Sequence, residues 1–286
     1  MTQLFADKPT PAEPVVRVAR LVKRFEGRAV LDGVDLDVYP GETMVVMGPS
    51  GCGKSTLLRL MIGSMWPDGG LVELFGRDLS GLGEAELDGV RKRFGILFQS
   101  GALFNSMTVG ENVALPLREH TDLDDDTIDI IVRIKLELVG LRQAIDRMPA
   151  EISGGMKKRA ALARAVALDP EILFYDEPSA GLDPVTSAEI DHLIMALSGK
   201  LGVTSVVVTH EMDSAFRIAD RMAMLDRGRM LKVGEKRLFE DIRARTGEPG
   251  RAGEVIGQFL RGEPDGPITA RRQADGYEDD ILGVSR

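Results

Sequence analysis

The sequence predicts an α/β fold: a central, mostly parallel sheet, an antiparallel β part near the N-terminus, and a helical insertion over roughly residues 100–165. Three observations predict it. Short apolar runs recur along the chain and end at polar or glycine-rich segments. A glycine-rich loop follows one run, Thr43–Met47, and precedes a helix rich in Leu and Met. Alternating residues on both sides of Glu26-Gly27-Arg28 indicate a hairpin.

Composition limits the classes of protein to consider. The 286 residues are 43% hydrophobic and carry a formal charge of −9, which does not favour sequence-independent binding to nucleic acid. The only cysteine, Cys52, excludes an intrachain disulfide and suits a reducing cytoplasm. No apolar run reaches the roughly 18 residues that cross a bilayer. We expect a flexible leader at 1–14, one domain at 15–245, and an extension at 246–286 with little core of its own.

The antiparallel part is predicted from runs on both sides of the 26–28 turn and from a further strand at 71–76. Phe25 stands just before that turn. Its ring could pack the hairpin or stack on an adenine, and spacing alone leaves both open. Met222–Val233 predicts a second, closing hairpin around Arg227-Gly228.

A phosphate-binding loop lies between the strand at 43–47 and the helix that begins at Lys54. Its residues are Gly48, Pro49, Ser50, Gly51, Cys52, Gly53, Lys54 and Ser55, followed by Thr56. The glycines let the backbone wrap an anion, and the helix N-terminus directs its N–H groups at phosphates. Lys54 adds a positive charge over the outer phosphates, and the Ser55 hydroxyl is placed to hold Mg2+.

Three further buried strands end in polar residues. The runs at 94–98, 171–175 and 204–208 are followed by Gln99, by Asp176-Glu177, and by His210. Carboxyl ends of parallel strands carry the ligand-facing groups of α/β sheets. Adjacent carboxylates there are costly unless they meet a cation or a reacting water.

These strand ends predict a nucleotide site. Asp176 and Gln99 are candidate Mg2+ ligands beside Ser55, Glu177 is the candidate to polarise the attacking water, and His210 contacts a phosphate. Lys54, Gln99, Glu177 and His210 are therefore the predicted catalytic residues.

The insertion is predicted to be helical. Pro116 should break any long helix after Asn105, and the acidic stretch 122–129 should open the next one. An apolar stripe then recurs at helical spacing, which core packing explains: Ile128, Ile131, Ile134, Leu138 and Leu141. The basic runs at 91–93 and 157–159 are interpreted as solvated helix faces.

A second potential phosphate site precedes the alanine-rich helix at 157–168. It consists of Ser153, Gly154, Gly155 and Met156, and an ordinary N-cap would explain it equally well. Because Lys54 already occupies the phosphates within one subunit, we expect a head-to-tail pair of subunits. Each Ser153 would then cap the γ-phosphate held by the other subunit's Lys54, so that two ATP molecules join the pair.

The order of GPSGCGKST, Gln99, ISGGM, ILFYDE, SAGLD and His210 resembles the ATP-binding subunit of ABC transporters over residues 15–240. The resemblance implies a P-loop NTPase in which Phe25 stacks on adenine and Gln99 couples the site to a membrane subunit. It implies that residues 153–156 are read by the opposite subunit, that Asp183 belongs to the dimer-contact loop, and that His210 senses the γ-phosphate. Met156 replaces the usual glutamine, and Phe25 stands where tyrosine is common.

Further segments resemble the ATPase of Mla-type phospholipid transporters, relatives of the Mce-linked systems. They are LFQSGALF at 97–104, ALPLREHT at 114–121, QFL at 258–260 and DGP at 265–267. The resemblance implies a homodimer on the cytoplasmic face of the inner membrane, bound to a permease, a periplasmic MCE lipid-binding protein and a cytoplasmic STAS-domain protein. It implies a role in outer-membrane lipid asymmetry, and an extension, including Tyr277, that crosses onto the neighbouring subunit.

Alternatives are the ATPase of an importer of amino acids or small solutes, or of a lipoprotein-release system. A DNA-repair or translation ATPase is disfavoured because no coiled-coil insertion precedes ISGGM. A GTPase is disfavoured because the sequence has no Asn-Lys-x-Asp element.

Overall fold

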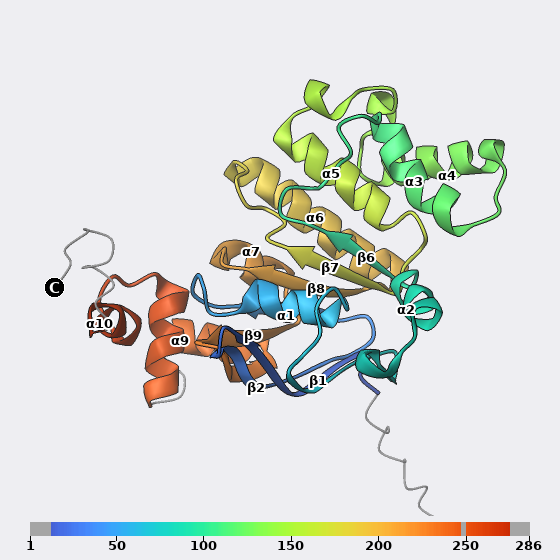
Figure 1. Cartoon of the computed structure of the whole chain (residues 1–286). Helices are drawn as coiled ribbons and strands as arrows, with labels where there is room; N and C mark the ends of the chain where they lie inside the picture. The colour runs from blue at the N-terminus through green and yellow to red at the C-terminus, as the bar shows by residue number, and fades with distance from the viewer. Residues whose placement is uncertain (1–12, 247–249, 275–286) are drawn as a thin grey trace, which may run out of the picture.

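The computed structural model describes residues 13–246 and 250–274; most of the predicted leader, and Tyr277, lie outside them. A six-stranded sheet forms the centre in the order β10-β9-β3-β8-β7-β6, parallel except for β10 (Figure 1). Its strands are β3 (Thr43–Met47), β6 (Phe94–Leu97), β7 (Ile172–Asp176), β8 (Thr204–Thr209), β9 (Arg221–Asp226) and β10 (Arg229–Glu235). The predicted α/β fold with a mostly parallel sheet is confirmed.

The predicted antiparallel part is a four-stranded sheet, in the order β2-β1-β4-β5. Its strands are β1 (Val16–Phe25), β2 (Arg28–Val38), β4 (Gly69–Leu74) and β5 (Arg77–Asp78). Glu26 and Gly27 have φ of 50° and 80°, the left-handed pair that a tight two-residue hairpin requires. Helix α1 (Lys54–Met61) is buried between this sheet and the central one.

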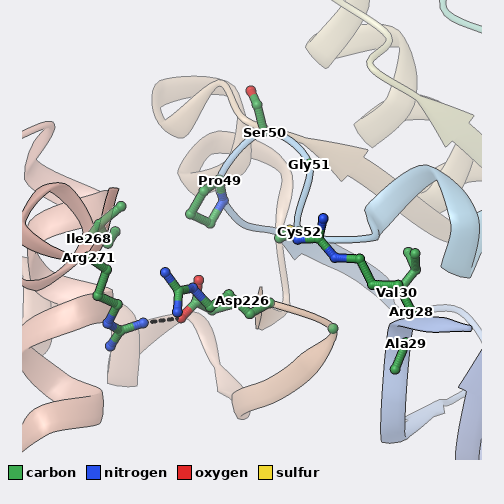
Figure 2. A pocket seen from close by; sticks show the side chains of 12 residues that line it. Arg28, Ala29, Val30, Pro49, Ser50, Gly51, Cys52, Asp226, Ile268 and Arg271 are labelled. Atoms are coloured by element: carbon green, nitrogen blue, oxygen red, sulfur yellow. Dashed lines mark hydrogen bonds and ion pairs between the residues drawn. The ribbon is translucent and has the colours of Figure 1, made fainter. Parts of the chain in front are cut away.

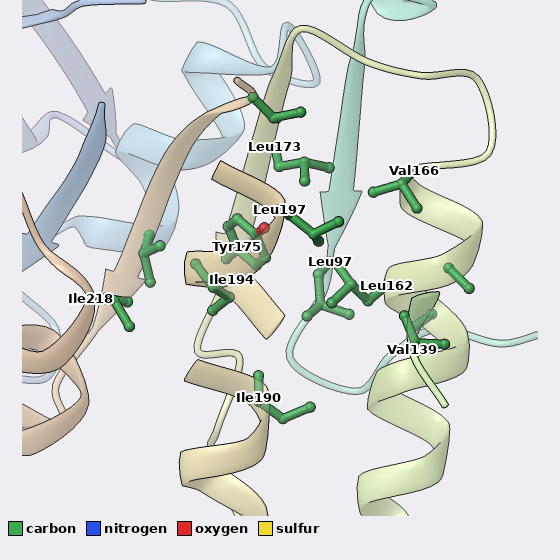
Figure 3. Packing of buried hydrophobic residues seen from close by; sticks show 14 of the residues in the cluster. Leu97, Val139, Leu162, Val166, Leu173, Tyr175, Ile190, Ile194, Leu197 and Ile218 are labelled. Carbon is green, nitrogen blue, oxygen red and sulfur yellow. The ribbon is translucent and has the colours of Figure 1, made fainter. Parts of the chain in front are cut away.

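The other face of the central sheet is covered by helices. Alternate strand residues divide between the faces: Val45, Tyr175 and Val207 join the helical core, whereas their neighbours join the α1 side. Figure 3 shows Tyr175 and Leu173 packed with Leu162 and Ile194. Helices α5 (Gly154–Ala165), α6 (Pro184–Leu201) and α7 (Met212–Ile218) lie against this face, and α3 (Val109–His120) and α4 (Asp125–Leu138) pack on α5.

Short elements complete the connections between these layers. They are η1 (Leu79–Gly81) and α2 (Glu84–Arg91) before β6, with η2 (Arg142–Ala144) and η3 (Pro149–Glu151) between α4 and α5. Among the described residues, no helix has the length and apolar character to span a bilayer.

The prediction that Pro116 breaks the helix is wrong, because α3 continues through it to His120. The ring removes one helical hydrogen bond at a cost of about 3 kcal/mol. A capping box offsets part of that cost: Thr108 Oγ1 accepts from Glu111 N, and Glu111 Oε2 accepts from Thr108 N. Burial of Val113 and Leu117 then stabilises the helix on both sides of the proline.

The predicted core stripe of α4 is partly wrong. Ile128 is buried, but Ile134 and Leu138 are 54% and 44% exposed. The buried apolar positions of α4 are Ile128, Val132 and Leu136, at i, i+4 and i+8. The helix carries more apolar residues than one face can bury, so spacing alone did not identify the inner face.

The C-terminal extension joins the main core through the apolar residues of α9. Helix α8 (Lys236–Arg243) leads to α9 (Arg251–Arg261) and α10 (Pro267–Ala274). Val255, Ile256 and Leu260 are buried in the same cluster as Phe239 of α8. Gly and Arg lower the average hydropathy here, but the apolar residues still fall on one face of α9.

Candidate functional site

The polar residues that follow the buried strands gather at one edge of the central sheet. Strands β3, β8, β7 and β6 are parallel neighbours, so their carboxyl ends face the same side (Figure 1). The phosphate loop follows β3, His210 follows β8, Asp176 and Glu177 close β7, and Gln99 follows β6. The structure therefore assembles the four predicted strand ends along one edge.

The phosphate loop is packed tightly against the sheet. Gly48 has φ 154°, and a Cβ there would come within 2.1 Å of the Leu225 carbonyl oxygen, so only glycine fits. Gly53, in the left-handed conformation, caps α1. The Lys54 side chain is buried, and its Nζ donates to the carbonyl oxygens of Gly48 and Pro49 at 2.6 and 3.1 Å. The loop thus holds an ammonium group at its centre, with Ser55 exposed at the helix N-terminus.

Glu177 and His210 form a pair. Their Oε1 and Nδ1 atoms are 2.8 Å apart, and His210 N donates to Oε2 at 3.2 Å. Glu177 is only 8% exposed and has a φ of 49°, a conformation that costs energy for a residue with a side chain. The carboxylate is therefore held in one position at the strand end.

Asp176 has the electrostatics of a cation ligand. Burial raises its pKa, and the charge of Glu177 raises it further, while Arg59, Lys158 and Lys54 lower it. Its Oδ1 atom is buried without a hydrogen-bond partner among the described residues. Gln99 and Asp176 line the same cavity, of about 550 Å³, so the structure brings these two candidates together.

Lys158 is a site residue that the sequence analysis missed. Its Nζ donates to the Glu177 carbonyl oxygen at 3.1 Å, and the residue is 5% exposed. Burial lowers the pKa of this amine, against the raising effect of Asp176, Glu177 and Glu211. The interpretation of the 157–159 run as a solvated face is wrong for Lys158. Its i+3 and i+4 positions, the apolar Ala161 and Leu162, were the signal that it faces inward.

Ser153 and Asp183 cap helices in this subunit. Ser153 Oγ accepts from Met156 N at 3.2 Å at the start of α5. Asp183 Oδ1 accepts from Val185 N and Thr186 N at 3.0 and 3.1 Å at the start of α6. Both residues are exposed, and among the described residues neither forms a hydrogen bond to the phosphate loop. Within this subunit, the contacts of Ser153 and Asp183 are those of helix caps.

Phe25 lies at the end of β1 with 43% of its surface exposed. Lys23 Nζ lies 5.6 Å from the centre of its ring. The hairpin therefore leaves the ring partly exposed.

A phosphate loop after β3, a histidine after the adjacent strand β8 and paired carboxylates at the end of the next strand, β7, define a P-loop nucleotide hydrolase. Residues 31–180 match the sequence model of the family described as ABC transporter. The chain belongs to the ABC transporter family, and it is the subunit that binds and hydrolyses ATP. These matches confirm the prediction from the sequence motifs that the chain is an ABC transporter ATP-binding subunit and an ATPase.

Similar proteins cover nearly the whole chain. The "Intermembrane phospholipid transport system ATP-binding protein MlaF" of Haemophilus influenzae is 40% identical, over 94% of this chain and 98% of that protein. The protein of the same name from Escherichia coli K12 is 43% identical, over 89% and 91%. "Probable ribonucleotide transport ATP-binding protein mkl" of Mycobacterium tuberculosis is 41% identical, over 91% and 70%.

Solved structures share the fold. The dimeric bacterial ABC transporter cassette MJ0796 superposes with a TM-score of 0.72 at 30% identity, over 77% of this chain and 98% of that one. A dimeric form of the same cassette binds ADP and Pi after hydrolysis. The cbiO1 protein of Clostridium perfringens gives a TM-score of 0.73 at 26% identity, over 82% and 96%.

Proposed function

We propose that this chain is the ATPase of an Mla-type phospholipid transport system, in which ATP binding and hydrolysis move a membrane permease. The observation that carries this proposal is the match to MlaF of Haemophilus influenzae over 94% of this chain and 98% of that protein. Ribonucleotide transport is the second candidate, because mkl is 41% identical to this chain. It ranks second because the match covers only 70% of that protein.

Mg2+ fits the residues at the strand ends. Asp176 Oδ1, which has no hydrogen-bond partner within the described part of the chain, the Gln99 side chain that lines the same cavity and the Ser55 hydroxyl are the oxygen ligands that a hard cation prefers. The ion would neutralise charge on the outer phosphates. Glu177, held by His210, orients the attacking water and accepts its proton, while His210 and Lys54 contact the γ-phosphate.

A head-to-tail homodimer would complete the site. Ser153, exposed at the N-terminus of α5, can direct its hydroxyl and the first N–H groups of the helix at a phosphate held by the partner. The dimeric state of cassette MJ0796 supports the same arrangement here. Asp183 would lie in the contact between the subunits, and Phe25 would stack on adenine.

An apolar cavity of about 580 Å³ is lined by Phe98, the residue before Gln99. We propose that the permease binds there. Phe98 and Phe104 line the cavity and are 41% and 50% exposed, and Pro116 and His120 extend it toward α3. A cytoplasmic segment of a permease with apolar side chains fits this surface, and Gln99 would transmit its movement. The chain would then lie on the cytoplasmic face of the inner membrane, with an MCE protein and a STAS-domain protein in the same complex.

Isolation of the tagged chain from detergent-solubilised membranes of its own cell tests this function. We expect a permease and an MCE protein by mass spectrometry, together with bound phospholipid. A different permease without enriched lipid would keep the ATPase and contradict the lipid substrate. Uptake of labelled ribonucleotide by vesicles containing that complex would favour the second candidate.

A further inference from the structure

A second cavity, of about 480 Å³, adjoins the phosphate loop on the side of the C-terminal extension. Its walls are the loop at 49–52, the start of β2 at 28–30, the β9–β10 turn at 226–228, and Ile268 and Arg271 of α10. Figure 2 shows Asp226 between the loop and α10, with Arg271 bonded to it. Residues from opposite ends of the chain therefore enclose one space beside the nucleotide site.

Asp226 places a negative charge beside the loop that is expected to bind the phosphates of ATP. It is 8% exposed and closes β9, and the Leu225 carbonyl oxygen before it lies against Gly48 of the loop. Its charge reaches the loop: burial is the main cause of the raised pKa of Cys52, Lys54 opposes it, and Asp226 adds to it. Left alone, this carboxylate would repel the phosphates of ATP.

Arg271 of α10 neutralises that charge. Its Nη1 lies 2.8 Å from Asp226 Oδ2, and the two side chains are 22% and 10% exposed. Helix α10 is fixed in place by Gln258 of α9, which is 5% exposed. Gln258 Oε1 accepts from Ile268 N at 2.7 Å, and its Nε2 donates to Thr269 Oγ1 at 2.6 Å. The position of Arg271 is thus set by buried contacts of the extension.

The opposite wall of the cavity, formed by the start of β2, lies on the side where we expect the base and ribose of the nucleotide. Arg28, which lines it, pairs with Phe25 in the β1–β2 register. Phe25 carries the exposed ring proposed to stack on adenine. A nucleotide that reaches from this ring to the phosphate loop passes beside Asp226.

We propose that the C-terminal extension is part of the ATP site of its own subunit, where Arg271 cancels the Asp226 charge and so sets ATP affinity. This proposal rests on ATP binding by the chain and adds a residue outside the family motifs. Detachment of α10 would expose the carboxylate and weaken ATP binding, so any partner that moves the extension would regulate the ATPase.

The test is ATP binding to the full-length chain by titration calorimetry at low and high salt. We expect Arg271→Ala to weaken ATP binding about fivefold at low salt and less at high salt, since salt screens the exposed carboxylate. Asp226→Asn should bind ATP at least as tightly as the unmodified chain, and the double variant should regain the affinity that Arg271→Ala loses.

The control is Arg245→Ala, which removes an equal charge from the residue just before the extension, where Arg245 is 71% exposed and pairs with Glu263, and it should leave ATP binding unchanged. Unchanged binding by Arg271→Ala, weaker binding by Asp226→Asn alone, or no recovery in the double variant would overturn the proposal while leaving the ATPase assignment intact. Absence of ATP binding by the unmodified chain would contradict both.

Discussion

Glu177 is held from three directions at the end of β7. His210 contacts its carboxylate at 2.8 Å, Lys158 donates to its carbonyl oxygen at 3.1 Å, and its own N–H donates to the Val208 carbonyl oxygen at 2.8 Å. These contacts come from β8 and α5, so the position of one carboxylate depends on two neighbouring elements. The same contacts offset the strained backbone of Glu177.

Glu177→Gln should keep ATP binding and lose turnover by at least about 100-fold, because the amide cannot accept the proton of the attacking water. Phosphate release and ATP titration measure the two quantities. Glu171→Gln is the matched control: it removes the same charge at the opposite end of β7, where Glu171 only pairs with Arg93 at the surface. Turnover by Glu177→Gln equal to that of this control would contradict the assigned role.

Lys158→Met should lower kcat about tenfold, a loss of about 1.4 kcal/mol, with little change in KM, because the donor to Glu177 is removed while ATP contacts remain. The neighbouring change Lys157→Met keeps α5 equally apolar and should leave kcat unchanged. Steady-state kinetics of both variants decides this. Equal kcat values in the two would show that the buried amine does not position Glu177.

Single residues differ in how far the sequence could predict them. Asp176 and His210 stand at or just after the ends of apolar runs, and Lys54 ends the loop after another, so their place at the sheet edge followed from strand order. Lys158 and Arg271 stand on helices, and their contacts depend on how those helices pack against the sheet. Local patterns do not encode that packing.

Helices α6 and α7 begin just after Asp183 and His210, and a buried polar cluster joins them. Asp191 of α6 has no exposed surface; it accepts from Ser214 Oγ at 2.5 Å and forms an ion pair with Arg217 of α7. A buried carboxylate without such partners would be costly. The cluster therefore fixes α7, and with it the segment that carries His210, relative to α6.

Asp191→Asn should lower the free energy of unfolding by about 1–2 kcal/mol, less than for a fully buried pair because Arg217 is 39% exposed. Asp213→Asn, also on α7, breaks an ion pair whose carboxylate is 85% exposed, and should cost less than about 0.5 kcal/mol. Urea unfolding measures both. A loss for Asp191→Asn no larger than for this control would contradict a stabilising role for the cluster.

The sequence predicted whether a segment is a helix or a strand more reliably than it predicted which face of that element is buried. The strands at 43–47 and 94–97 were visible as apolar runs, and the hairpin turn was visible from Glu26-Gly27. Pro116 and the outer residues of α4 were mispredicted for a shared reason. Whether a proline is tolerated, or an isoleucine buried, depends on neighbouring helices.

At the scale of the whole molecule, the N-termini of α1 and α5, the two helices proposed to bind phosphate, lie in different layers. Helix α1 starts at Lys54, between the two sheets, whereas α5 starts at Ser153 in the helical layer on the other face of the central sheet. One subunit can therefore supply only half of each proposed site. A head-to-tail pair supplies both halves twice.

Mixing two inactive variants tests this composite site. Lys54→Ala removes the loop charge, and Ser153→Asp keeps an N-cap for α5 but places a carboxylate against the γ-phosphate. Each variant alone should lose ATPase activity. A mixed dimer has one intact site, formed by Lys54 of one subunit and Ser153 of the other, so an equal mixture should regain about a quarter of full activity. If each site lay within one subunit, the mixture would stay inactive, because every site would carry a defect.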